Sequence, residues 1–195
     1  MKKIKKAVLP VAGFGSRYIP ATKATPTEML PIMAKPLVQY AVEEAIAIGI
    51  EEIIFITSPA KNSIQKHFDK SYELEKKLIS SGKNDFLEKL NPSIFDNIKF
   101  KYINQIEQKG LGHAVLLAEE HIKNEPFAIL LPDDLFFSEE SCLTQLSKVY
   151  ALKENSVVAV NKIDSKNIHK YGVINPGKIE GRSIDIIDII EKPKL

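Results

Sequence analysis

The segment EIIFIT, residues 52–57, is an unbroken apolar run of strand length, a pattern typical of a strand that is buried on both faces. It follows residues 36–49, where apolar side chains recur at helical spacing, and an earlier apolar run at Ala7–Val11. A strand, a helix and a second buried strand form a βαβ unit, in which the two strands lie parallel in one sheet. This unit restricts the folds that the rest of the chain can complete.

The same alternation continues along the chain. A helix is expected to open at Ser58-Pro59 and to end near Phe68, and the polar stretch 69–96 is expected to hold short helices with turns at 80–84. Further strands are expected at 98–103, 127–131, 157–160 and near Ile190, and further helices at 111–122 and 141–153. The chain is therefore predicted to be α/β, with a mostly parallel central sheet and helices on both faces, in a single domain over residues 1–195.

Charge, hydropathy and cysteine content exclude several classes of function. The formal net charge is +2, and 25 of the 27 basic residues are lysines spread along the chain, so no nucleic acid partner is expected. No stretch approaches the roughly 20 apolar residues of a membrane helix, so no membrane partner is expected. The single cysteine, Cys142, excludes an internal disulfide framework and fits a reducing cytoplasm. We interpret it as a small apolar residue rather than a nucleophile.

Residues 13–31, GFGSRYIPATKATPTEMLP, follow the first strand and have neither helical nor strand periodicity. Gly13 and Gly15 would allow backbone N–H groups to approach an anion closely, and Arg17 adds a positive charge. A tight turn explains the two glycines equally well. The dinucleotide-binding pattern G-x-G-x-x-G is not met, because residue 18 is Tyr18. The prolines restrict the backbone, which favours a loop held in one shape around a ligand.

Two later strand ends carry polar residues that suggest chemistry. Gln105 offers two N–H donors and an acceptor, the complement of a uracil edge, and a solvated glutamine is the ordinary alternative. Asp133 and Asp134 end an apolar strand, where carboxylates need water or a cation, and such oxygen ligands suit Mg²⁺ shared with substrate phosphates. Asp133 is the stronger candidate, since Asp134 can equally cap the next turn. His113 has no partner histidine at metal-ligand spacing, so a packing or capping role is expected.

Six ordered motifs carry a resemblance to a known family. They are the array of Gly13, Gly15, Arg17, Pro20, Thr22, Pro26 and Pro31, then KPLVQYAVEEA, QKGLGHAV (108–115), EPFAILLPDD (125–134), KYGVI (170–174) and IIEKPK (189–194). In this order they resemble the sugar-1-phosphate nucleotidyltransferases, and most closely the bacterial members that transfer a uridylyl group from UTP to glucose 1-phosphate. The resemblance covers essentially the whole chain and is weakest over residues 70–97.

The resemblance implies a Rossmann-like nucleotidyltransferase fold and Mg²⁺-dependent in-line transfer, in which UTP and glucose 1-phosphate give UDP-glucose and pyrophosphate. It also implies a cytoplasmic enzyme and a homo-oligomer. The motifs, matched residue by residue, assign nucleotide binding to Ala12, Gly13, Gly15, Gln105 and Gly110, catalysis to Arg17, Asp133 and Lys192, sugar binding to Gly172 and Glu191, and the metal to Asp133.

Two departures from the family pattern keep other functions open. Thr27 stands where the family signature has a lysine, and a hydroxyl does not replace an ammonium that offsets phosphate charge; Lys23, on the same loop, can supply such a charge. The chain stops at Leu195, directly after EKPK, so the C-terminal part of the family fold is expected to be absent. The alternatives are a degenerate or truncated homologue that binds nucleotide or nucleotide sugar without turnover, and the same reaction with dTTP or ATP.

Overall fold

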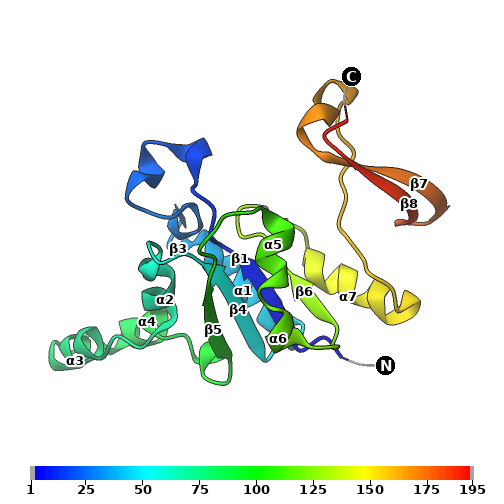
Figure 1. Cartoon of the computed structure of the whole chain (residues 1–195). Helices are drawn as coiled ribbons and strands as arrows, with labels where there is room; N and C mark the ends of the chain where they lie inside the picture. The colour runs from blue at the N-terminus through cyan, green and yellow to red at the C-terminus, as the bar shows by residue number, and fades with distance from the viewer. Residues whose placement is uncertain (1–2, 194–195) are drawn as a thin grey trace. The chain divides into compact units, whose positions relative to one another are not determined.

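The structure is a computed structural model that describes residues 3–193. The chain divides into two compact units, one ending at Thr144 and the other beginning at Gln145, and each is described by itself (Figure 1). Compact units are not necessarily separate domains, so the expectation of a single domain stays a prediction. Lys194, the last residue of the IIEKPK motif, lies outside the described residues. Within residues 3–193, no helix is both long enough and apolar enough to cross a membrane.

The first unit is built on a four-stranded sheet in the order β5-β4-β1-β6, with every neighbouring pair parallel. The strands are β1 (Lys6–Pro10), β4 (Glu52–Thr57), β5 (Lys99–Asn104) and β6 (Phe127–Ile129). β1 and β4 lie at the centre, and their side chains are almost all buried, whereas those of the edge strand β5 are only half-buried. The most apolar runs of the sequence thus become the strands that are covered on both faces.

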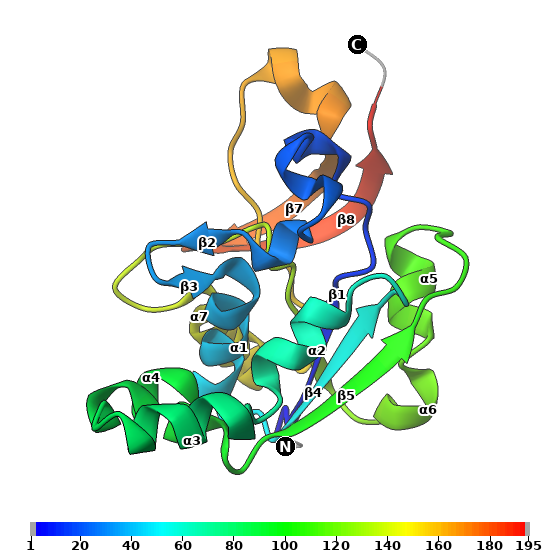
Figure 2. The ribbon, with the colours of Figure 1, turned by 90° about the vertical axis from the view of Figure 1, so that its left-hand side faces the viewer.

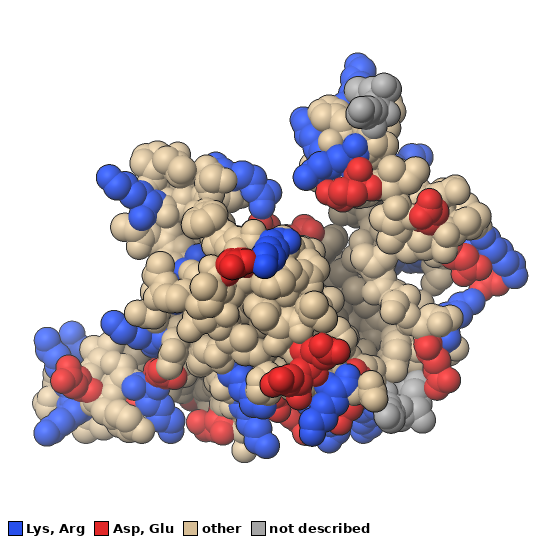
Figure 3. All heavy atoms as spheres, in the orientation of Figure 1, with Lys and Arg blue, Asp and Glu red and all other residues tan. Residues whose placement is uncertain are grey.

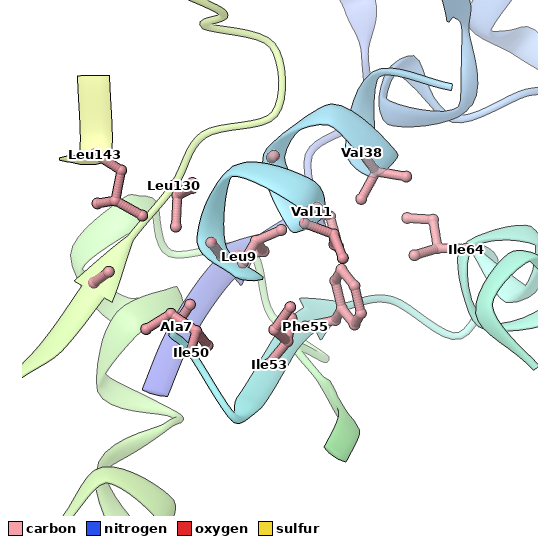
Figure 4. Packing of buried hydrophobic residues seen from close by; sticks show 14 residues of the cluster. Ala7, Leu9, Val11, Val38, Ile50, Ile53, Phe55, Ile64, Leu130 and Leu143 are labelled. Carbon is pink, nitrogen blue, oxygen red and sulfur yellow. The ribbon is translucent and has the colours of Figure 1, made fainter. Parts of the chain in front are cut away.

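Helices cover both faces of this sheet, as the alternation predicts (Figure 2). The helices of this unit are α1 (Leu37–Ala47), α2 (Asn62–Phe68), α3 (Tyr72–Ser80), α4 (Leu87–Leu90), α5 (Leu111–Leu116) and α6 (Glu119–Ile122). On one face Leu9 and Phe55 pack with residues of α1 and α2 (Figure 4). On the other face Val8 and Ile54 pack with residues of α5 and α6. Side chains that alternate along β1 and β4 therefore fill two separate cores.

Two segments of this unit stand apart from the sheet. Residues 11–30, called here the glycine loop, contain three single turns of 3₁₀ helix and lead into the short antiparallel pair β2 (Pro31–Ile32) and β3 (Lys35–Pro36). The polar stretch 69–96 forms α3 and α4 with a turn between them, as expected.

Figure 3 shows that, on the face in view, Lys and Arg side chains are interspersed with Asp and Glu.

The second unit contains an antiparallel hairpin. Helix α7 (Cys142–Lys153) spans the boundary between the units, and a 3₁₀ helix at Ser165–Lys170 leads to β7 (Gly172–Glu180) and β8 (Ser183–Glu191). The two strands pair from Gly172–Glu191 to Glu180–Ser183, with register shifts around Pro176. Because β7 and β8 pair with each other, the strand near Ile190 is not a parallel strand of the central sheet, contrary to the expectation.

Three further details of the predicted elements are wrong. Residues 157–160 do not form a strand in the described structure, because no neighbouring backbone supplies the hydrogen bonds that a strand needs. The helix expected from Ser58 begins only at Asn62, because residues 58–61 form a turn closed by a hydrogen bond from the Lys61 N–H to the Ser58 carbonyl. The helix expected over 111–122 is divided into α5 and α6.

Candidate active site

Most of the residues that the sequence singled out lie at one edge of the sheet. Because β1, β5 and β6 run in the same direction, the loops that follow them leave from their carboxyl ends at the same edge. The glycine loop follows β1, Gln105 follows β5, and Asp133 comes shortly after β6. Segments distant in the sequence therefore meet where ligands bind in sheets of this kind.

Gly15 is the glycine that the loop conformation requires. Its φ is +66°, and a Cβ at this position would overlap the Thr27 Oγ1. The Thr22 hydroxyl donates a hydrogen bond to the Gly15 carbonyl oxygen at 2.6 Å, which closes the turn. Gly13 is different, because a Cβ there would meet nothing within 4 Å. Gly15 is thus needed by the loop itself, whereas the backbone at Gly13 faces open space.

Thr27 is a buried residue of the glycine loop. The residue is 5% exposed, and its Oγ1 has no hydrogen-bond partner among the described residues. A buried donor or acceptor without a partner destabilises a folded protein by about 1–3 kcal/mol. The position at which the family signature has a lysine is therefore occupied by a small side chain whose hydroxyl the surrounding residues leave unpaired.

Replacing Thr27 with valine, which keeps the shape and removes the hydroxyl, is expected to leave the free energy of unfolding unchanged or to raise it by up to about 1 kcal/mol. Urea denaturation measures this difference. Thr22→Val is the matched control on the same loop, because it removes a hydroxyl that has a partner, and we expect it to lower the free energy by about 0.5–1.5 kcal/mol. A Thr27→Val protein less stable than the control would contradict the interpretation of an unpaired hydroxyl.

A buried ion pair connects the glycine loop to the turn between β4 and α2. The Lys61 Nζ lies 2.8 Å from the Glu28 Oε2, and the two side chains are 9% and 10% exposed. The same Nζ donates a hydrogen bond to the Val11 carbonyl oxygen at 2.7 Å. Val11 is the first residue of the loop and Glu28 lies near its end. One ammonium group therefore binds both ends of the glycine loop.

Arg17 and Asp133, two of the three residues assigned to catalysis by the resemblance, contact each other. The Arg17 Nη2 donates a hydrogen bond to the Asp133 Oδ2 at 2.7 Å across a sequence separation of 116 residues. The contact is possible because β1 and β6 are neighbours in the sheet, so the loops after them start side by side. Both residues are exposed, and such a pair contributes only about 0–1 kcal/mol to stability. Its main consequence is to bring a carboxylate of the loop after β6 into contact with a cation of the glycine loop.

The loop after β5 holds a buried glutamine. Gln105 is 5% exposed, and its Nε2 lies 2.9 Å from the His113 Nδ1 and 3.4 Å from the Gly110 carbonyl oxygen. A second glutamine, Gln108, donates from its Nε2 to the Ala12 carbonyl oxygen at 2.7 Å. The segment expected to contact the base is therefore tied directly to the segment expected to contact the phosphates.

The remaining predicted site residues lie together in the second unit. Gly172 pairs with Glu191 across the β7–β8 hairpin, and a Cβ at Gly172 would lie 3.1 Å from the Glu191 Oε2. The Lys192 N–H donates to the Tyr171 carbonyl oxygen at 3.0 Å, and the Lys192 Nζ lies 3.5 Å from the Glu191 Oε1. The glycine thus leaves room for the carboxylate, and the carboxylate lies beside the lysine.

Metal-ligand clusters and the Cys142 thiol concern two other kinds of chemistry. In the part of the chain that the structure describes, no cluster of three or more His, Cys, Asp or Glu residues could hold a metal ion by itself. Burial raises the pKa of the Cys142 thiol, and the charges of Glu44 and Asp134 raise it further. The thiol is therefore protonated at neutral pH, which makes it a poor nucleophile.

Sequence reasoning missed the Glu28–Lys61 pair and the contacts of Gln108 and His113. Lys61 stands in the polar sequence SPAKNS, where a lysine normally points into solvent, so no pattern identified it as buried. Glu28 gave a weak signal, because it is the only acidic residue in residues 13–31. These contacts depend on tertiary structure, which periodicity does not report.

The parallel sheet, the glycine loop at the carboxyl end of its central strand and the polar groups beside that loop define an α/β protein of the nucleotide-binding, Rossmann-like class. Residues 6–195 match the family model described as nucleotidyl transferase, and the chain belongs to that family.

Within this family the chain is similar to named uridylyltransferases. It is 49% identical over 194 residues to the UTP–glucose-1-phosphate uridylyltransferase of Staphylococcus haemolyticus, with 100% of this chain and 67% of that protein covered. It is 47% identical over 194 residues to UTP–glucose-1-phosphate uridylyltransferase 2 of Staphylococcus saprophyticus, with the same coverage. The chain thus spans about two thirds of the length of these relatives.

Solved structures agree with this relationship. A UDP-glucose pyrophosphorylase complexed with UDP-glucose matches with a TM-score of 0.81 and 40% identity, covering 97% of this chain and 69% of that one. A UTP-bound UGPase from Acinetobacter baumannii matches with a TM-score of 0.90 and 36% identity, covering 98% and 68%. The expected Rossmann-like nucleotidyltransferase fold is therefore confirmed.

Proposed function

We propose that this chain is a nucleotidyltransferase that forms UDP-glucose and pyrophosphate from UTP and glucose 1-phosphate. Near-half identity over the whole chain to proteins named for this reaction supports the proposal. The single structural observation that supports it is the contact between Arg17 of the glycine loop and Asp133, because a cation and a carboxylate at this edge of the sheet suit the phosphates of a nucleotide and their metal.

The chemistry requires alignment and charge neutralisation more than proton transfer. A phosphate oxygen of glucose 1-phosphate attacks the α-phosphorus of UTP; the new P–O bond forms as the bond to the β-phosphate oxygen breaks, and pyrophosphate leaves with its electron pair. The nucleophile is already an anion at neutral pH and needs no general base. In this proposal backbone N–H groups of the glycine loop hold the phosphates, and Arg17 offsets their charge.

Nucleotidyltransferases of this kind generally use a divalent metal, and we propose Mg²⁺. Asp133 is exposed at the edge of the sheet where the carboxyl ends of the strands lie, and it presents carboxylate oxygen atoms. Mg²⁺ prefers such hard oxygen ligands. A single carboxylate fits this ion, because Mg²⁺ usually keeps several waters and binds through one or two carboxylates together with substrate phosphates. When bound, the ion would neutralise phosphate charge.

The base and sugar contacts are also proposals. We assign the base to Gln105 and the backbone of Gly110, and the sugar to Gly172 and Glu191, with Lys192 placed to pair with a phosphate. Gln105 is buried and forms contacts with neighbouring residues, and Glu191 and Lys192 lie beside each other, which supports these roles.

We also propose a location and an assembly state. The substrates and the single cysteine fit action in the cytoplasm. A homo-oligomer is proposed on the resemblance alone.

The test is Mg²⁺-dependent release of pyrophosphate by the purified chain from UTP and glucose 1-phosphate, compared with dTTP, ATP and CTP in place of UTP. We expect turnover with UTP that stops when EDTA removes the metal. No turnover with any nucleotide, from a chain shown by circular dichroism to be folded, would overturn the proposal that this polypeptide is itself an enzyme.

A second candidate function is binding without turnover, and the buried Thr27 favours it because the loop lacks the lysine of the family signature at this position. A rise in melting temperature with UDP-glucose, together with no pyrophosphate release, would support this alternative.

A further inference from the structure

The side-chain amide of Gln105 is held in one orientation by two acceptors. Its Nε2 lies 3.4 Å from the Gly110 carbonyl oxygen and 2.9 Å from the His113 Nδ1. A carbonyl oxygen only accepts hydrogen bonds, so the amide atom that faces Gly110 has to be the nitrogen. If the amide were turned by 180°, its oxygen would face the carbonyl oxygen of Gly110.

This orientation also fixes the tautomer of His113. Because the Gln105 Nε2 carries two hydrogens and donates toward Nδ1, the His113 Nδ1 carries no hydrogen. The imidazole is therefore the tautomer with its hydrogen on Nε2. Both hydrogens of the Gln105 amide are then used inside the protein, one on Gly110 and one on His113.

The amide oxygen of Gln105 remains available. Within residues 3–193, no group donates a hydrogen bond to this Oε1, and the atom is not fully enclosed by the protein. Gln105 follows β5 at the edge of the sheet where the glycine loop lies, and the neighbouring Gln108 contacts Ala12 of that loop. The group that Gln105 offers a ligand is consequently an acceptor and not a donor.

We propose that His113 is a positioning residue that sets the preference for uridine over cytidine by fixing the orientation of the Gln105 amide; this rests on the proposed function, in which Gln105 contacts the base. The N3–H of uracil is a donor and pairs with the free Oε1. The N3 of cytosine is an acceptor, so its lone pair would face the amide oxygen. Cytidine therefore binds more weakly than uridine, because two acceptors face each other in a buried place. The protein discriminates between the two bases without any charged group at the base.

A pair of variants with the same shape tests the proposal. His113→Leu removes the acceptor, so the amide is held only by Gly110 and turns more easily. His113→Asn has the same branching as leucine and restores an acceptor, its Oδ1, at the same distance along the side chain. The measurement is the ratio of kcat/KM for UTP to kcat/KM for CTP. We expect this ratio to fall about three- to tenfold in His113→Leu and to stay near the wild-type value in His113→Asn.

The chain offers a control for the loss of a histidine–glutamine contact elsewhere. His67 lies 2.9 Å from the Gln39 Oε1 on the other face of the sheet, and His67→Leu is expected to leave the ratio unchanged. A ratio that stays the same in His113→Leu, or that falls equally in His67→Leu, would overturn the proposal. The proposed function is tested separately, on the wild-type chain with UTP. An inactive wild type would overturn the proposed function, whereas an active enzyme whose UTP-to-CTP ratio does not depend on His113 would overturn only the role of His113.

A measurement on the wild-type protein needs no variant to fold. The ¹⁵N shifts of the His113 ring, from NMR spectra that correlate ring nitrogens and ring protons, should show hydrogen on Nε2 and none on Nδ1. Hydrogen on Nδ1 at neutral pH would contradict the assigned orientation and overturn the proposal directly.

Discussion

Replacing Lys61 with methionine is expected to lower the free energy of unfolding by about 3–5 kcal/mol, because it breaks a buried ion pair. The substitution removes the only cation that pairs with Glu28 within residues 3–193; the Glu28 side chain is 10% exposed. It also removes the donor to the Val11 carbonyl oxygen. A carboxylate buried without a cation is strongly unfavourable. Urea denaturation, followed by circular dichroism, measures the change.

An exposed pair in the same unit is the matched control. The Lys5 Nζ and the Glu51 Oε1 lie 2.8 Å apart with more than half of each side chain exposed, and Lys5→Met should change stability little because solvent screens the pair. Combining Lys61→Met with Glu28→Leu should recover much of the loss, because no charge is then left buried. If Lys61→Met were no more destabilising than Lys5→Met, the buried pair would not anchor the glycine loop.

The second large effect is expected on catalysis. Asp133→Asn should lower kcat/KM for pyrophosphate release by about 100-fold or more, because it removes the negative charge that faces Arg17 and that we assign to Mg²⁺. The amide keeps an oxygen that can accept from Arg17, and both residues are exposed, so the melting temperature should change little. Loss of activity with unchanged stability is therefore the expected combination.

The adjacent carboxylate is the control for this prediction. Asp134→Asn changes the charge by the same amount one residue away, and its activity should stay within about a few fold of wild type. The opposite result, with Asp134→Asn inactive and Asp133→Asn active, would move the proposed metal ligand to Asp134 and contradict the role assigned to the Arg17–Asp133 pair.

The strands of the central sheet could be predicted from the sequence because burial on both faces requires unbroken apolar runs. The expected strand at 52–57 has the observed bounds, and Ala7–Val11 is displaced by only one residue from β1. The apolar run at 157–160 has the same local pattern and forms no strand, because a run of this kind shows the tendency to be extended but not the presence of a neighbouring strand.

The candidate site was predictable in its positions and less so in its contacts. That Arg17 and Asp133 lie near each other follows from the positions of β1 and β6, which the rule on carboxyl ends already suggested. The partners of Gln105 were not predictable, because the Gly110 carbonyl faces the amide only after the chain has turned at Gly110, where φ is +95°. The roles assigned to all ten site residues stay predictions.

The hydrogen bond from Gln108 to the Ala12 carbonyl joins the loop after β5 to the start of the glycine loop. In thermodynamic terms this contact links two binding equilibria, since a ligand that orders one loop reduces the conformational entropy that the other loop has left to lose. Linkage is reciprocal, so whatever the uridine group adds to the affinity for a phosphate, the phosphate adds equally to the affinity for uridine. The two halves of a nucleotide would therefore bind this edge of the sheet more tightly together than the sum of their separate free energies.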